Sequence, residues 1–118
     1  MPKTVIFLFH DDDASLNAGS HVAERVRQVV GDRGVELKVF CFGSAQGALT
    51  DESTDEIRGE YRKQIDALAV ARVKVGAFLN AATSAGTVDE LIARGLNLHF
   101  ARGAFVRYAL EGATAISF

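Results

Sequence analysis

Short apolar runs alternate along the chain with longer segments of helical periodicity, and this alternation constrains the fold most. The first run, residues 5–9, contains no polar side chain, which is typical of a strand covered on both faces of a parallel sheet. The next segment carries apolar residues three and four positions apart, after Asp12 and Asp13, either of which can cap a helix. The chain therefore opens with a strand followed by a helix.

The same alternation predicts five strands, at residues 5–9, 35–42, 73–79, 96–100 and 113–118. Capping boxes at Ser53 and Thr87 predict the start of two helices, and the stretches 43–51 and 80–86 are expected to be loops. Connections of this length favour parallel neighbours. We expect an α/β fold, a three-layer α/β/α sandwich around a mainly parallel five-stranded sheet, with residues 1–118 forming a single domain.

Composition excludes several classes of function. The formal net charge of -2 gives no bulk signal for binding nucleic acid or an anionic membrane. Apolar runs are all shorter than the roughly 18 residues of a membrane-spanning helix. Cys41 is the single cysteine, so the chain cannot form an internal disulfide, and a reducing compartment fits this best. We expect a cytoplasmic protein without a nucleic-acid or membrane partner.

Ligands bind outside the carboxyl ends of the strands in sheets of this kind. That rule selects His10 and Asp11 after the first strand, Gly43 after the second and Asn80 after the third as ligand-binding candidates. The glycine-rich turn at Gly43 could present backbone N–H groups to a small anion. A histidine that is merely satisfied at a strand end, and a plain turn at Gly43, are the alternatives.

The acidic run of Asp11, Asp12 and Asp13 could hold Mg²⁺, and it is similar to the opening of a response-regulator receiver domain. Receiver domains also need an aspartate at the end of a later strand, where this chain has 78–80 as Phe-Leu-Asn. Aspartates at this place also favour a helix N-terminus. We therefore expect no metal and no cofactor.

Cys41 is the only candidate nucleophile and is the candidate catalytic residue. It would be reactive only if its surroundings lowered the thiol pKa. Because it shares a strand face with Val35, Leu37 and Val39, a packed structural thiol is the alternative.

Four segments together resemble the DsrE/DsrF-like family of small cytoplasmic α/β domains, which includes sulfur-relay components. They are residues 5–12, 35–43, 73–80 and 103–112. Members that transfer sulfur carry a cysteine two residues before an asparagine that corresponds to Asn80. This chain has Phe78 there, and a phenylalanine cannot carry a persulfide.

The resemblance implies a protein that binds a small ligand or a protein partner at the strand ends without catalysis. The alternative is a sulfur carrier that uses Cys41 as its persulfide site, with a sulfur-relay protein as partner. The family also implies a homo-oligomer, a trimer or hexamer. Phe40, Phe42, Phe105 and Tyr108 are candidates for its interface, since aromatic residues favour interface cores, although each could equally pack inside the domain.

Overall fold

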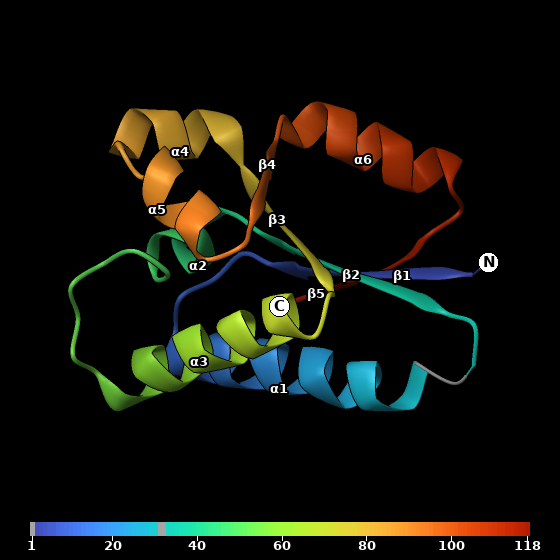
Figure 1. Ribbon diagram of the computed structural model, residues 1–118, viewed down its shortest axis with the longest axis horizontal. Coiled ribbons are helices and arrows are strands. Elements are labelled where there is room, and N and C mark those ends of the chain that lie inside the picture. The colour runs from blue at the N-terminus through green and yellow to red at the C-terminus, as the bar shows by residue number, and fades with distance from the viewer. Residues whose placement is uncertain (1, 31–32) are drawn as a thin grey trace.

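A computed structural model describes residues 2–30 and 33–118 and contains a five-stranded, fully parallel sheet in the order β4-β3-β2-β1-β5 (Figure 1). The strands are β1 Lys3–Leu8, β2 Glu36–Cys41, β3 Lys74–Phe78, β4 Asn97–His99 and β5 Thr114–Ser117. The helices are α1 Asp13–Val30, α2 Gly43–Gly47, α3 Glu56–Val70, α4 Leu79–Ala85, α5 Val88–Ala93 and α6 Ala101–Leu110. The predicted α/β sandwich is confirmed.

Helices cover both faces of the sheet, as Figure 1 shows for α1 and α3 on one side and α6 on the other. On the first face, the strands pack against the helices α1 and α3 through residues such as Leu16 and Ile65. On the second face, Ala104 and Tyr108 of α6 pack against Val5 and Phe7. The domain therefore has two hydrophobic clusters, one on each side of the sheet.

Alternate residues of β2 point to opposite faces, as the sequence predicted. Leu37, Val39 and Cys41 belong to the first cluster, and Phe40 belongs to the second. Two of the residues proposed for an oligomer interface, Phe40 and Tyr108, are buried within the domain. That part of the interface prediction is wrong, because both rings belong to the second cluster, Phe40 from the sheet and Tyr108 from α6.

The order of the strands explains how the helices are distributed. Each connection from β1 to β4 moves one place across the sheet in the same direction, and the last connection returns past β1 to β5. Because such crossovers are right-handed, the last one runs on the opposite face from the others. The chain therefore leaves the neighbouring strands β3 and β4 toward opposite faces, and this arrangement opens a crevice at their carboxyl ends.

The helix starts agree only partly with the predicted caps. Asp12 caps α1 by accepting a hydrogen bond from the Ser15 amide at 3.0 Å. At α3 the cap is Asp55, which accepts from the Arg58 amide at 3.1 Å. The predicted capping box at Ser53 is wrong, because its hydroxyl accepts from the Asp55 amide and shapes the preceding turn instead.

Two stretches expected to be loops contain the short helices α2 and α4. Both are rich in glycine, alanine and serine and lack a clear apolar stripe. The residue Thr87 does precede α5, but its hydroxyl donates to the Ala82 carbonyl at 3.5 Å rather than closing a capping box. Within the described residues, no helix has the length and apolar character needed to cross a membrane.

Candidate functional site

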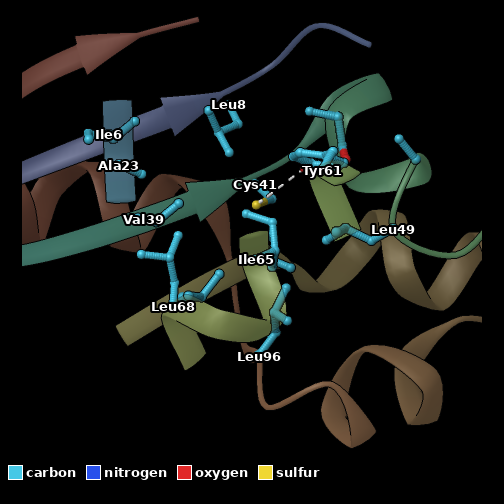
Figure 2. Close-up of a cluster of buried hydrophobic side chains, with 14 of the residues drawn as sticks. Ile6, Leu8, Ala23, Val39, Cys41, Leu49, Tyr61, Ile65, Leu68 and Leu96 are labelled. Carbon is cyan, nitrogen blue, oxygen red and sulfur yellow. Dashed lines mark hydrogen bonds between the residues drawn. The ribbon is translucent and has the colours of Figure 1, made fainter. Parts of the chain in front are cut away.

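Cys41 lies inside the first hydrophobic cluster, where Figure 2 shows its sulfur pointing among Leu8, Ile65 and Tyr61. Its exposed fraction is 0%. The Tyr61 hydroxyl lies 3.7 Å from the sulfur and donates to the Ala45 carbonyl at 2.8 Å. Burial raises the pKa of the Cys41 thiol to about 12, so the thiolate that would attack a sulfur donor is scarce at neutral pH. The arrangement matches a structural thiol.

His10 and Asp11 follow β1 but face different surroundings. The His10 side chain is exposed, with its ring 6.3 Å from that of Phe9. Asp11 accepts a hydrogen bond from Arg58 Nη2 at 2.7 Å, and the other terminal nitrogen of Arg58 lies 2.7 Å from Asp51. This hydrogen bond from Arg58 lowers the pKa of the Asp11 carboxyl. Asp11 thus joins the end of β1 to the start of α3.

Two carboxylates of the acidic run already make contacts within the domain. Asp11 is paired with Arg58, and Asp12 caps α1. In residues 2–30 and 33–118, no group of three or more His, Cys, Asp or Glu side chains is arranged to hold a metal ion.

Gly43 adopts a left-handed conformation with φ of 60°, which favours glycine. A Cβ there would also lie 3.1 Å from the Phe9 carbonyl oxygen. That same oxygen accepts hydrogen bonds from the Ala45 amide and the Ser44 hydroxyl, both at 3.1 Å. The turn thus directs these two donors to the backbone at the end of β1. The Ala45 amide is therefore not available to bind an anion.

Asn80 lines a cavity of about 220 Å³ at the carboxyl ends of β3 and β4. The other residues lining this strand-end cavity are Phe78, Phe100, Ala101 and Arg102. Gly43 lines a different, smaller cavity together with residues of α2 and α4. The structure therefore places Asn80 and Gly43 at different cavities, and it brings Asn80 together with Phe78.

The backbone at Phe78 is held by a buried glutamine from α2. Gln46 Nε2 donates to the Phe78 carbonyl at 3.0 Å, and the Phe78 amide donates to Gln46 Oε1 at 2.8 Å. The β2–β3 ladder ends one residue earlier, at the pair Cys41 and Ala77. The glutamine amide thus continues the ladder by one step and fixes the wall of the strand-end cavity.

Phe100 and Arg102 give the strand-end cavity its chemical character. The Phe100 side chain is 53% exposed, and Arg102 lies in the first turn of α6, which contains no acidic residue. The dipole of α6 adds positive potential at this end of the helix. The strand-end rule also selects residues 100–103 after the fourth strand, although Phe100 and Arg102 were not among the predicted ligand-binding residues.

The strand-end cavity combines aromatic surface with polar donors. Among the described residues that line it, there is one amide and one guanidinium but no thiol, hydroxyl, imidazole or carboxylate. Such a lining can orient an anionic ligand, but it supplies neither a nucleophile nor a general base.

The fold of this chain is similar to that of several solved structures. No family model and no curated protein matches the sequence significantly. The chain is similar to the ychN protein from E. coli, with a TM-score of 0.77 and 16% identity over 100% of both chains. It is also similar to MTH1491, a protein of unknown function from Methanobacterium thermoautotrophicum, with a TM-score of 0.74 and 20% identity over 100% of both chains.

A third similar structure is BT1422, a conserved protein of unknown function from Bacteroides thetaiotaomicron. Its TM-score is 0.76 with 11% identity, over 98% of this chain and 94% of that one. At these identities the similarity shows a shared fold.

Proposed function

We propose that this chain is a DsrE/DsrF-like domain that lacks the sulfur-carrying cysteine and binds a small ligand at the carboxyl ends of β3 and β4. The observation that carries the proposal is the strand-end cavity, where Asn80 and Arg102 lie beside Phe78 and Phe100. Its position supports the proposal further, because the chain leaves β3 and β4 toward opposite faces and ligands of α/β sheets bind at such points.

The lining favours a ligand with one acidic group attached to a flat apolar part. A guanidinium binds a carboxylate through two parallel hydrogen bonds, and the Asn80 amide can donate a further one. The rings of Phe78 and Phe100 offer apolar surface on which an aromatic ligand can pack. The cavity size of about 220 Å³ suits a small molecule better than a peptide.

The geometry gives little support to sulfur transfer through Cys41. The thiol is sealed between β2 and α3, and the position expected for the cysteine holds the Phe78 ring. A persulfide on Cys41 would have to form inside the first hydrophobic cluster without contact with solvent. We therefore prefer the binding role. A protein partner that contacts the same strand ends is the other candidate.

We extend the proposal to a homo-oligomer, a trimer or hexamer, that uses the outer surface of α6 and the edge strand β5. Val106 and Leu110 project from α6 with large exposed fractions, and Ile116 is exposed on β5. An edge strand with exposed apolar neighbours is a common site of association.

Calorimetric titration with benzoate tests the ligand proposal, because benzoate joins a carboxylate to an aromatic ring. The native chain is expected to bind it, and Arg102→Gln is expected to weaken binding by about tenfold, the loss of a charge-assisted hydrogen bond. Arg25→Gln on α1 removes an equal charge elsewhere and should leave the affinity unchanged. Equal binding by the Arg102→Gln protein would contradict the proposal.

A further inference from the structure

A second cavity, of about 430 Å³, lies on the second face of the sheet beside α6. We call it the basic cavity. Residues from three strands and one helix line it, among them Lys38, Lys74, Gly76, His99, Arg107 and Tyr108. It is separate from the strand-end cavity and has a different chemical character, because three basic side chains and one carboxylate line it.

Positive charge exceeds negative charge at the basic cavity. The described residues in and around it include the cations Lys3, Lys38, Lys74 and Arg107 and the carboxylates Glu36 and Glu111. Glu111 lies 3.3 Å from Lys3 and 3.4 Å from Lys38, while Glu36 lies 3.8 Å from Lys74. The whole chain has a formal net charge of -2, so an excess of two positive charges here is a local concentration.

Lys38 places an ammonium group beneath α6, at the inner wall of the cavity. The residue is only 8% exposed, and a buried lysine requires partners. Its hydrogen bond within the described residues goes to Glu111 at 3.4 Å, and its Nζ lies 5.4 Å from the centre of the Tyr108 ring. An ammonium has three N–H donors, so Lys38 retains donors for a ligand in the cavity.

Ion pairs account in part for two of the cations, because Lys38 pairs with Glu111 and Glu36, and Lys74 lies 3.8 Å from Glu36. No ion pair among the described residues accounts for Arg107. Lys74 has a side chain that is 70% exposed. Arg107 packs over the Tyr108 ring, with 5.4 Å between its Cζ and the ring centre. Both side chains can therefore reach a ligand without giving up a buried ion pair.

His99 and Gly76 shape the wall between these cations. Burial, reinforced by Arg107 and Lys38, lowers the pKa of the His99 imidazole, so the ring is largely uncharged at neutral pH. It stacks on Phe40 with 6.4 Å between ring centres. A Cβ at Gly76 would lie 3.0 Å from the Phe40 ring and 3.3 Å from the His99 ring, so a glycine there avoids crowding both.

We propose that the basic cavity binds a small organic dianion, with its acidic groups held by Lys38, Lys74 and Arg107. Phosphate esters and dicarboxylates share this chemistry. An anion can accept charge-assisted hydrogen bonds from the three cations, and the uncharged His99 ring can contribute a further one. The proposal is independent of the function proposed for the strand-end cavity.

NMR titration of the histidine ring protons at constant ionic strength tests this inference, with methyl phosphate and succinate as separate probes. His99→Gln assigns the His99 signal, and His10 and His21 serve as references on other elements. Binding is expected to raise the pKa of His99, because the anion offsets the effect of Arg107 and Lys38. Lys74→Gln and Arg107→Gln should each weaken binding by about tenfold.

The controls separate a built site from general attraction of anions. Lys63→Gln on α3 and Arg25→Gln on α1 remove equal charges from the first face and should change the affinity by less than about twofold. A preference for methyl phosphate or for succinate would identify the acidic group. Failure of both probes to bind at millimolar concentration, or equal weakening by the control variants, would overturn the inference. Arg102→Gln should leave this binding intact, whatever its effect at the strand-end cavity.

Discussion

The side chain of Gln46 is hydrogen-bonded to both peptide groups of Phe78, at 2.8 Å and 3.0 Å. This contact joins α2 to the junction of β3 and α4, 32 residues further along the chain. It fixes the position from which Phe78 lines the strand-end cavity. A buried polar side chain therefore fixes the backbone at Phe78.

Gln46→Ala should destabilise the domain by about 2 kcal/mol, because it leaves the partly buried N–H and carbonyl of Phe78 without their partner. Urea unfolding followed by circular dichroism measures the change. The matched control is Gln28→Ala on the exposed surface of α1, which should stay within about 0.5 kcal/mol of the native protein. Equal stability of the two variants would show that the contact is dispensable.

The buried Cys41 thiol should make stability decrease in alkaline solution. Its pKa is about 12 in the folded chain, compared with an ordinary value of 9.0. The unfolded chain therefore loses this proton first, and the stabilisation is complete below about pH 9 and declines as the pH rises toward 12. At about pH 10 the expected loss is on the order of 1 kcal/mol.

Cys41→Ala isolates this contribution. The variant is less stable at neutral pH because it leaves a cavity, but its stability should depend less steeply on pH between about 8.5 and 10. Urea unfolding at several pH values measures both slopes. Parallel slopes for the native and variant proteins would refute the assignment of a sealed, protonated thiol.

Phe78→Cys, made together with Cys41→Ser, should create a reactive thiol in the strand-end cavity. A partly exposed thiol with an ordinary pKa has on the order of a thousand times more thiolate at neutral pH than one with the pKa of Cys41. Arg102 lines the same cavity and should lower the thiol pKa further. Alkylation rates followed by intact mass measure the reactivity.

Val70→Cys on α3, also made in the Cys41→Ser background, is the control for simple exposure, because Val70 is 84% exposed. The thiol at position 78 should react faster than the control thiol and should slow when Arg102→Gln is added. Slower alkylation at position 78 than at position 70 would mean that the cavity does not activate a thiol.

Leu110→Lys should reduce the size of the assembly if α6 and β5 form the proposed interface. Leu110 is 83% exposed on α6, and a lysine ammonium buried between copies would be unfavourable. Sedimentation equilibrium measures the mass. Val70→Lys places the same charge on α3 and should leave the mass of the assembly unchanged. An unaltered mass for Leu110→Lys would show that α6 does not form the interface.

The fold could be predicted because apolar runs such as residues 5–9 and the alternating faces of β2 record burial directly. The strand-end cavity could be located only in part. Asn80 was found from its position after a strand, but the partnership of Gln46 with Phe78 depends on a contact between distant segments. The pairing of Asp11 with Arg58 is equally long-range, so this ion pair could not be predicted from the sequence.

The surroundings of Cys41 show the same limit. The alternation of residues in β2 predicted which face Cys41 points to. Whether the thiol is exposed or buried there depends on Tyr61 and Ile65 of α3, which the sequence pattern of β2 does not reveal. Short helices such as α2 and α4 were missed because their small residues carry no periodic pattern.

The central claim is that the carboxyl ends of β3 and β4 form the binding site. NMR amide spectra recorded during a benzoate titration test it most directly. The account predicts that the signals of Asn80, Ala101 and Arg102 shift first and saturate together, while those of α1 and α3 stay in place. Shifts centred on other elements, or none in this group, would contradict the claim.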